Sequence, residues 1–427
     1  MDRRMLLKLL SASALIRSSP ILASALAPDT LVLNSADETL LDDIQRRGCL
    51  YFAEQASPHT GQVLDRAKWV NSTGVLDSRR MASIAATGFG LSALCIADKR
   101  GWQPTAQVIE QVRRTLRFHC DTLPHDHGFF AHFNDIETGK AWGNTEISSI
   151  DTTLLLCGVL TVRAHFNHDA EIVRLATTLY ERVDWPWMLN DGPAFAMGWF
   201  PESGFIPQRW SHYCELMMIY LLAIGSPTHP VSPEHWNSFS RPPIRYDGLS
   251  YISGDDPIFT HQYSQAWFDF RQKRDAWADY FTNSVTATRA HKAFCLSMPN
   301  WYSPDYWGIT ASDSVHGYTV WGGPPSRGLI DGTVVPCAAA GSLAFLPSDC
   351  LAVLRSMRAN YPKAWGRYGF VDAFHPAANW YNPDVLGIDL GIGVLMAENL
   401  RSELVWDTFM RNAESTRAMQ LAGFRPA

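Results

Sequence analysis

Apolar positions recur at helical spacing along most of the chain, and no stretch alternates convincingly between apolar and polar residues with the period of two that a strand requires. The pattern predicts about a dozen helices separated by long irregular segments. The predicted helices span residues 38–56, 81–100, 105–120, 146–166, 169–189, 210–224, 262–270, 274–295, 337–345, 348–360, 388–399 and 402–414. We therefore expect an all-α protein.

Two of these helices, 81–100 and 146–166, are apolar on most of their faces, which is typical of helices enclosed by other helices. Two concentric layers of helices would provide that burial, and the lack of a short sequence repeat argues against a solenoid. We expect an (α/α)6 barrel, or toroid, whose long aromatic-rich loops form a cleft at one end. No segment resembles a linker, so a single domain is predicted over residues 36–424.

Residues 1–27 combine a charged start, with Arg3 and Arg4 side by side, and a short apolar, small-residue stretch. This is the pattern of an export signal, and the paired arginines suggest the twin-arginine type. Arg17 and Pro20 interrupt the apolar stretch too early for a permanent membrane anchor. The predicted location is periplasmic or secreted. The alternative is an ordinary basic start of a protein that stays in the cytoplasm.

Composition narrows the function. The chain is 46% hydrophobic and 18% charged with a net charge of -6, so it offers no basic surface for nucleic acid. Its 16 tryptophans exceed what a core readily accommodates, because the indole N–H needs a partner when it is buried, and sugar rings stack on such faces. The eight cysteines are widely spaced without a C-x-x-C pair, which favours buried free thiols over zinc ligands. We predict no metal and no cofactor.

The predicted helix 146–166 begins with two acidic residues, Glu146 and Asp151, before a strongly apolar run. A carboxylate beside a buried helix is costly unless it is paired or hydrogen-bonded. Helix capping is one explanation, with Thr145 or Ser148 as the N-cap and Asp151 in the first turn. Catalysis is the other.

A further carboxylate, Glu215, interrupts the apolar helix predicted over 210–224. A buried salt bridge would explain it. Glycoside cleavage, however, requires one carboxylic acid to protonate the leaving oxygen and a second carboxylate to activate water or to attack. An apolar setting would raise the pKa of the acid. Glu215 and Asp151 are therefore a candidate pair of catalytic carboxylates, with Glu146 close by in the sequence, and the residues alone do not say which one is the acid.

Candidate substrate-binding residues are those that place hydrogen-bonding groups or aromatic rings in the long loops or beside them. A polysaccharide lyase is a third reading of such a set, although the negative chain offers little attraction for an acidic sugar. The candidates are Asp65, Arg66, His132, Tyr213, Gln262, Trp267, Trp301, Trp307, Asp313, His316, Tyr318 and Asp372.

Five strings resemble those of the glycoamylase-like domain: IAATGFGL at 84–91, SSIDT at 148–152, AIGSPTHP at 223–230, WGITASD at 307–313 and YGFVDAF at 368–374. The resemblance runs from about residue 41 to residue 424 and is closest to the endo-β-1,2-glucanases of glycoside hydrolase family 144. It implies an (α/α)6 barrel that hydrolyses a bacterial β-glucan, most simply β-1,2-glucan, from within the chain. A β-1,2-glucan transglycosylase and a non-catalytic glucan-binding or assembly protein are the alternatives.

The resemblance also implies residue roles, with Glu215 as the general acid and Asp151 or Glu146 as the residue that positions water. Glu215 matches the glutamate of the family's Tyr-x-Glu segment, and Asp151 lies at the acidic position of the D-T-x-L-L helix, where the glucanases tend to carry glutamate. A second departure is the segment 388–393, in which the family more often has glutamine and proline around the glycine. If that segment contacts substrate, the accepted linkage or chain length differs.

Overall fold

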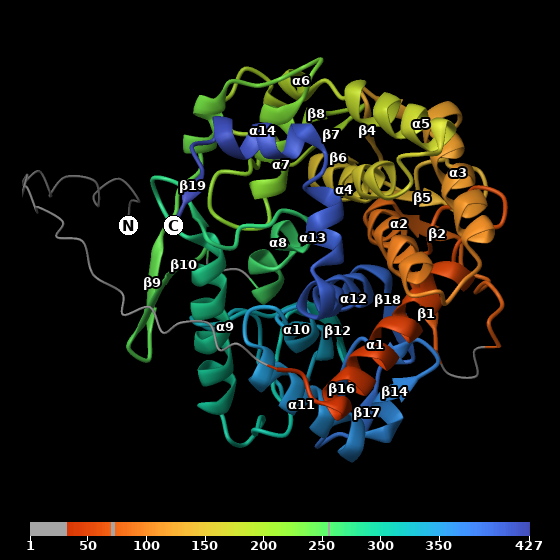
Figure 1. The fold of residues 1–427 in the computed structure, drawn as a ribbon. Coiled ribbons are helices and arrows are strands. Elements are labelled where there is room, and N and C mark those ends of the chain that lie inside the picture. Colours follow the sequence, from red (N-terminus) through yellow and green to blue (C-terminus); the bar gives the residue numbers. More distant parts are fainter. Residues whose placement is uncertain (1–31, 70–72, 255–256) are drawn as a thin grey trace, which may run out of the picture. The chain divides into compact units, whose positions relative to one another are not determined.

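The computed structural model describes residues 32–69, 73–254 and 257–427, and the predicted export signal lies outside them. Residues Leu33–Ala427 form one unit, described here by itself. Within it, buried helices stand side by side in a ring (Figure 1). The members of this inner ring are α2 (Ile84–Lys99), α4 (Ser149–His165), α7 (Met217–Gly225), α8 (Tyr263–Trp267), α10 (Pro336–Ala340) and α12 (Gly387–Ser402). Backbone or side-chain contacts join each to the next, and α12 packs against α2 to close the ring.

A second layer of helices covers the ring, each lying outside one or two inner helices (Figure 1). The outer helices are α1 (Ser35–Glu54), α3 (Thr105–Asp121), α5 (Ala170–Glu181), α9 (Tyr280–Leu296), α11 (Pro347–Asn360) and α14 (Ala413–Leu421). Helices α3 and α5 bury one side only, whereas α2 and α7 are buried almost all round, as their sequences predict. The predicted (α/α)6 barrel is confirmed.

Helix α13 (Leu404–Phe409) contacts the inner helices α2, α4, α8 and α12, at the end of the barrel where those helices finish. Asn412 donates from its side chain to the carbonyl of Leu160 near the end of α4, and Trp406 donates to the carbonyl of Gln265 in α8. One end of the barrel is therefore filled by the chain that follows α12. The opposite end, where the inner helices begin, is left for the long loops.

The inner helices α2 and α4 approach each other closely because each contributes a glycine to the contact. A Cβ atom on Gly88 would lie 2.2 Å from the carbonyl oxygen of Leu154, and one on Gly158 would lie 2.1 Å from the carbonyl oxygen of Gly88. No side chain fits between backbones at that distance. The spacing of these two helices is thus set by the pair Gly88 and Gly158.

The loops contain short ladders of two to four residues per strand, which the sequence pattern does not predict. Three single-turn helices also occur, η1 (Pro233–Asn237), η2 (Ile258–His261) and η3 (Pro362–Ala364), together with the short helix α6 (Trp185–Leu189). The antiparallel strand pairs are β1 (Arg66–Lys68) with β18 (Asp384–Leu386), β2 (Met81–Ser83) with β5 (Phe133–Asp135), β3 (His125–Asp126) with β4 (Phe129–Phe130), β9 (Pro243–Tyr246) with β10 (Leu249–Ile252), β11 (Lys273–Arg274) with β19 (Arg425–Pro426), β12 (Ala311–Ser314) with β13 (Gly317–Val320), β14 (Trp365–Gly366) with β15 (Gly369–Phe370) and β16 (Phe374–His375) with β17 (Trp380–Tyr381). Strands β6 (Ile147–Ser148), β7 (Gly198–Phe200) and β8 (Gly204–Phe205) form a three-stranded sheet.

Several predicted helices begin later in the structure. Helix α2 begins at Ile84 and not at 81, where β2 lies, and α9 begins at Tyr280 and not at 274, the last residue of β11. Helix α4 begins at Ser149 and not at 146, because Ile147 and Ser148 pair with β7. Helix α7 begins at Met217 and not at 210, because the amide of Tyr213 donates to the carbonyl of Ser240 and holds this segment extended. Glu215 consequently precedes its helix.

All eight cysteines lie in the described residues and none forms a disulfide, as expected. Among the described residues, no helix combines the length and the apolar character that crossing a bilayer would need.

Candidate active site

The loops that precede the inner helices bring together polar side chains far apart in the sequence. Arg66 lies before α2, Glu146 before α4, Glu215 before α7, and Asp389 in the first turn of α12. Since all inner helices begin at the same end of the barrel, these groups gather at one mouth. In the ring order, α7 and α12 stand opposite each other, so Glu215 and Asp389 face the mouth from opposite sides.

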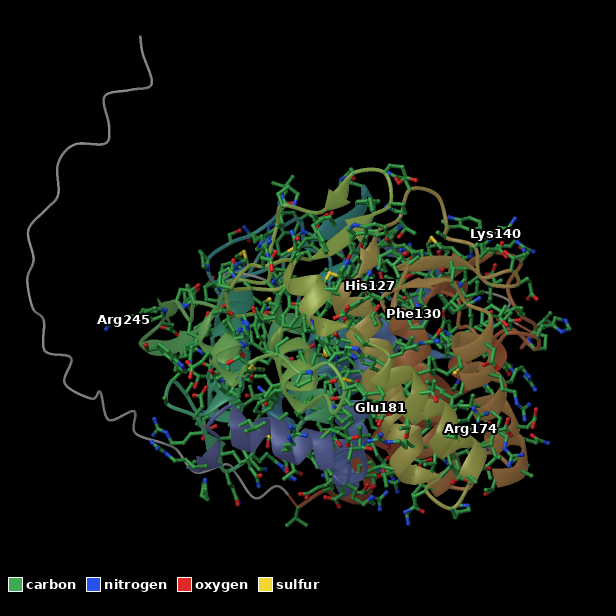
Figure 2. The ribbon with its side chains drawn as sticks, turned by 90° about the horizontal axis from the view of Figure 1, so that it is seen from above. His127, Phe130, Lys140, Arg174, Glu181 and Arg245 are labelled. Atoms are coloured by element: carbon green, nitrogen blue, oxygen red, sulfur yellow. The ribbon has the colours of Figure 1, made fainter. Side chains whose placement is uncertain are left out.

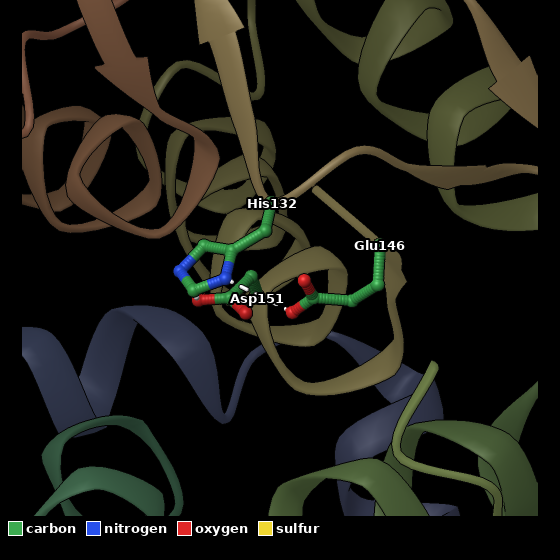
Figure 3. A group of neighbouring side chains, drawn as sticks. All are labelled: His132, Glu146 and Asp151. Atoms are coloured by element: carbon green, nitrogen blue, oxygen red, sulfur yellow. Dashed lines mark hydrogen bonds and ion pairs between the residues drawn. The ribbon is translucent and has the colours of Figure 1, made fainter. Parts of the chain in front are cut away.

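His132 lies between the two carboxylates that head α4 (Figure 3). Its Nδ1 donates to Oε1 of Glu146 at 3.0 Å, and its Nε2 lies 3.4 Å from Oδ1 of Asp151. The imidazole ring stacks on Phe133, with the ring centres 3.8 Å apart. His132, a predicted substrate-binding residue, thus forms a bridge between two acidic groups, with 28% of its side chain exposed.

The two carboxylates on either side of His132 have pKa values shifted in opposite directions. Burial lowers the pKa of His132, but Asp151 and Glu146 outweigh burial and raise it to about 9. Burial raises the pKa of Glu146, yet the hydrogen bond from His132 leaves that pKa below its ordinary value. Asp151 is more deeply buried, and desolvation leaves its pKa raised despite the attraction of His132. Glu146 is the more readily ionised of the two.

Ser148 explains why Asp151 stands at this position. It is the N-cap of α4 and accepts a hydrogen bond from the amide of Asp151 at 3.2 Å, while its hydroxyl donates to Oδ2 of Asp151 at 2.6 Å. The capping expected from the sequence is therefore present for Ser148. It does not account for the whole site, since the other oxygen of Asp151 faces His132.

His132, Glu146 and Asp151 could together offer three ligand atoms to a metal ion, and these atoms lie within 4.8 Å of one another. The two carboxylates, however, approach different nitrogens of the same ring. Three donors cannot converge on one ion unless the ring turns, because the nitrogens of an imidazole point in different directions. The arrangement is that of a cation between two anions.

A second group of polar residues is centred on Arg66. Its Nε donates to Oδ2 of Asp65 at 3.0 Å and its Nη1 to Oδ2 of Asp313 at 2.7 Å. The side-chain amide of Asn382 donates to Oδ2 of Asp313 and to Oδ2 of Asp372, both at 3.1 Å. Three of the predicted binding residues, Asp65, Arg66 and Asp313, thus meet at one point, and Asn382 links them to Asp372.

Asp372 continues this network into the barrel, where it meets Asp389. One oxygen of Asp372 accepts hydrogen bonds from the hydroxyl of Ser312 at 2.8 Å and from the amide of Asp313 at 3.0 Å. Its carboxyl group also hydrogen-bonds to that of Asp389, and both side chains are buried. Burial raises the pKa of both acids, and for Asp389 the neighbouring charge of Asp372 raises it further. Both carboxyl groups therefore bind a proton more readily than a free aspartate does, and Asp389 does so more than Asp372.

Glu215 lies in a pocket of about 490 Å³ on the other side of the mouth. Trp210, Phe259 and Val320 are among the residues that line it. The hydroxyl of Ser264, in α8, donates to the backbone carbonyl of Glu215 at 2.6 Å and fixes the turn before α7. The pocket falls within the range of ~300–1,000 Å³ that is usual for small-ligand sites.

Four predicted binding residues are buried inside the barrel and contact other parts of it. Gln262 donates to the carbonyl of Ala338 and to Ser342. The remaining three are Trp267, whose indole donates to Ser92, Tyr213, which contacts His261 and stacks on Tyr280, and Trp307, which packs against His291. Their partners are distant in the sequence, so the pattern of residues gave no sign of this burial.

The other predicted residues lie at the surface. Trp301 is 39% exposed and packs edge-on against His375. His316 occupies the turn of the hairpin β12–β13, and Tyr318 lies opposite Asp313 in that hairpin with 57% of its surface exposed. Tyr318 is therefore placed beside the Arg66 group and open to a ligand. No contact within the described residues connects Trp301 with that group.

The sequence analysis did not select Asp389, Asn382 or Cys337, which forms a hydrogen bond with Asp389. A usable signal existed for Asp389, since it is an acid at the start of the otherwise apolar segment 388–399, as Asp151 is in its own helix. None was available for Asn382, whose role depends on two aspartates that precede it by 10 and 69 residues.

With this geometry in view, the chain can be compared with known proteins. Residues 207–413 match the family model "Glycoamylase: Putative glucoamylase". An exo β-1,2-glucooligosaccharide sophorohydrolase from Parabacteroides distasonis is 27% identical over 426 residues, an alignment that takes in 90% of this chain. The chain spans 58% of the length of that curated relative.

Solved structures share the fold over nearly the whole chain. The endo-β-1,2-glucanase from Chitinophaga pinensis, in complex with sophorotriose and glucose, matches with a TM-score of 0.83 and 26% identity, covering 92% of this chain and 99% of that one. The β-1,2-glucanase from Parabacteroides distasonis matches with a TM-score of 0.83 and 25% identity, covering 92% of this chain and 61% of that one. Residues 207–413 of this chain are thus similar to the glycoamylase family model, and the helical barrel is shared with the β-1,2-glucanases.

Proposed function

We propose that this protein is a glycoside hydrolase that cleaves β-1,2-glucan within the chain, by carboxylate acid and base catalysis. The observation that carries the proposal is the mouth of the barrel, where Glu146, Glu215 and Asp389 all stand at the starts of inner helices. Such a set supplies both a proton donor and an ionised carboxylate. The substrate class is supported by the similarity to the glucanase from Chitinophaga pinensis over almost the full length of both chains.

Glu215 is the proposed general acid. It lies at the wall of the 490 Å³ pocket and is only 9% exposed, in the company of Trp210 and Phe259. In its protonated form this carboxyl group can deliver a proton to the glycosidic oxygen of a sugar bound in the pocket.

The base must be ionised and within reach of water, and Glu146 meets both conditions. The hydrogen bond from His132 favours its carboxylate form, and 27% of its side chain is exposed. Asp151 is less suitable, because desolvation raises its pKa and Ser148 occupies one of its oxygens. Asp389 is the second candidate for the base, since it stands in the first turn of α12 at the mouth, but burial and Asp372 raise its pKa, which disfavours the ionised form.

Arg66, Asp313 and Tyr318 would hold the sugar that occupies the mouth. Guanidinium and carboxylate groups fixed by mutual hydrogen bonds present donors and acceptors to hydroxyl groups at little entropic cost. Tyr318 adds an exposed ring beside them, on which a pyranose can stack.

Release of reducing sugar from linear β-1,2-glucan tests the proposal, with β-1,3- and β-1,4-glucans as controls. A ladder of oligosaccharides is expected, whereas release of disaccharide alone would identify an exo enzyme. New, longer oligosaccharides without a rise in reducing ends would identify a transglycosylase. Binding without turnover in the wild type, unchanged in Glu215→Gln, would identify a glucan-binding protein. Loss of activity in Glu146→Gln with recovery by azide would assign the base to Glu146, and the same result for Asp389→Asn would assign it to Asp389.

We also propose that the protein is exported through a twin-arginine signal within residues 1–27 and acts outside the cytoplasm. The paired Arg3 and Arg4 ahead of a short apolar stretch support this. Replacing both by lysine should retain the protein in the cytoplasmic fraction of a bacterial host.

A further inference from the structure

Trp142 stands at the edge of the molecule, four residues before Glu146, and is 40% exposed. Its amide donates to the carbonyl of Phe133 at 2.9 Å, and Phe133 in turn stacks on His132. Figure 2 shows Lys140, two residues earlier, projecting at the periphery. The backbone of Trp142 is therefore hydrogen-bonded to the strand next to His132, and part of its indole is exposed to solvent.

A groove of about 420 Å³ runs beside this indole, and its remaining walls are rich in guanidinium groups. The lining residues are Arg66, Ser78, Arg79, Arg80, Met81 and Trp142. Arg66 belongs to both the groove and the group around Asp313, so the groove is continuous with the mouth of the barrel. The Glu215 pocket shares none of these lining residues and is built from the loops of α7 and α8.

The arginines of the groove are held in place by carboxylates. Arg79 binds Asp77 and Asp384, and Arg80 binds both oxygens of Asp135 at 2.6 Å. Counted with Asp65 and Asp313 at Arg66, five carboxylates face three guanidinium groups, so the groove carries no excess of positive charge. Arg66 and Arg80 each use two of their five N–H donors in these bonds to described residues.

Fixed N–H donors beside an exposed indole, without net positive charge, suit a neutral ligand with many hydroxyl groups. An anionic ligand would have to compete with the carboxylates that already occupy each guanidinium. We propose that this groove is a saccharide subsite that holds glucosyl residues of the substrate distant from the cleaved bond, with one ring stacked on Trp142. The proposal rests on the proposed function for the identity of the sugar. It extends the binding cleft beyond the mouth, on the side away from Glu215, and so favours cleavage within long chains.

The test is the dependence of kcat/KM on chain length in Trp142→Ala. The ratio of kcat/KM for polymeric β-1,2-glucan to that for the linear tetrasaccharide should fall about tenfold, the effect of losing one stacking contact. Trp142→Phe should restore most of that ratio, because it keeps an aromatic face. Equal losses on both substrates, or no loss, would overturn the subsite.

Trp277→Ala is the matched control. Trp277 is 53% exposed, like Trp142, but its indole donates to Asn237 far from the mouth, so the length dependence should not change. If the wild type cleaves neither substrate, the proposed function fails, and the groove is judged by calorimetric binding of β-glucans alone. Weaker binding in Trp142→Ala, insensitive to added salt, then supports the groove, and unchanged binding overturns it.

Discussion

Asp372 and Asp389 hydrogen-bond to each other through their carboxyl groups, although 4% of one and 7% of the other is exposed. Asp372 is fixed as an acceptor by Ser312, by Asn382 and by the amide of Asp313. These three hydrogen bonds favour the ionised form of Asp372, and the pKa of Asp389 is the one raised further. Two acids placed so close in a buried site reduce the stability of the fold at neutral pH, because the pair must keep a proton that the same residues lose in water.

Asp389→Asn should stabilise the protein at pH 7 while it impairs activity. The raised pKa of Asp389 means that the folded state binds the proton more tightly than the unfolded state does. The stability contribution of this group is therefore greatest below the ordinary aspartate pKa of about 4, and it declines as the pH rises above that value. An amide needs no proton and still donates to Asp372. We expect a gain on the order of 1 kcal/mol in urea unfolding at pH 7 and a smaller gain at pH 4.

Asp384→Asn is the counterpart, because Asp384 accepts two hydrogen bonds from Arg79 and this variant loses an ion pair. It should be less stable than the wild type at pH 7. If Asp389→Asn were also less stable than the wild type at pH 7, that result would contradict the raised pKa of Asp389.

Glu215→Gln should lower kcat on β-1,2-glucan by about 10²–10⁴, the usual contribution of a general acid. Binding of oligosaccharide, measured by calorimetry in the same variant, should change little, since glutamine has the same shape. The melting temperature should also stay close to that of the wild type. Activity within a factor of about three of the wild type would remove Glu215 from the mechanism.

The stability of the folded protein should decrease at alkaline pH because His132 loses its proton there. Its pKa of about 9 in the folded state exceeds the ordinary value of about 6.5, so the stabilisation by its two ion pairs is complete below about pH 6.5 and is lost as the pH rises through about 9. Urea midpoints of the wild type should fall across that window, and those of His132→Gln should fall less. The kcat of the wild type should also fall in that pH window, and this fall should be shifted in His132→Gln.

His127→Gln is the control for that experiment, since His127 contacts a different carboxylate, Asp184, at an exposed position. It should reproduce the wild-type profile. Identical profiles for the wild type and His132→Gln would show that another group sets the alkaline limit.

Gly88→Ala should destabilise the barrel by about 2 kcal/mol, because the added methyl group would meet the backbone of α4, which cannot give way as a side chain does. Gly393→Ala, also in an inner helix, meets only the Cβ of Ala340 at 3.1 Å and should cost much less. Thermal unfolding of both variants checks the prediction. Equal melting temperatures would mean that α2 and α4 can separate freely.

The helical barrel could be predicted because burial on all faces leaves a direct mark on a sequence. The run of apolar residues from Leu154 to Leu160 identifies an inner helix without any knowledge of its neighbours. The starts of the helices at the mouth were harder to place. Two-residue strands such as Ile147–Ser148 are fixed by partners some fifty residues away and carry no periodic signal.

The candidate site was predictable in part for the same reason. An acid at the head of an apolar helix, such as Asp151, stands out from its surroundings, and Glu215 stands out in the same way. A buried tryptophan does not: Trp267 donates to Ser92, 175 residues earlier, and nothing near Trp267 in the sequence distinguishes it from the exposed Trp142. Tertiary contacts alone decide which aromatic residues meet a sugar.

The ladder between Arg66–Lys68 and Asp384–Leu386 joins the first loop of the mouth to the last inner helix. Because Asp372 and Asp389 come from the late part of the chain, a ribosome must make nearly the whole polypeptide before the mouth can be completed. A nascent chain that has emerged only as far as α11 has Glu146 and Glu215 but lacks Asp372, Asn382 and Asp389. Enzymatic competence would then arrive in a single step at the end of synthesis, and chains truncated before Asp384 should be inactive even if their helices form.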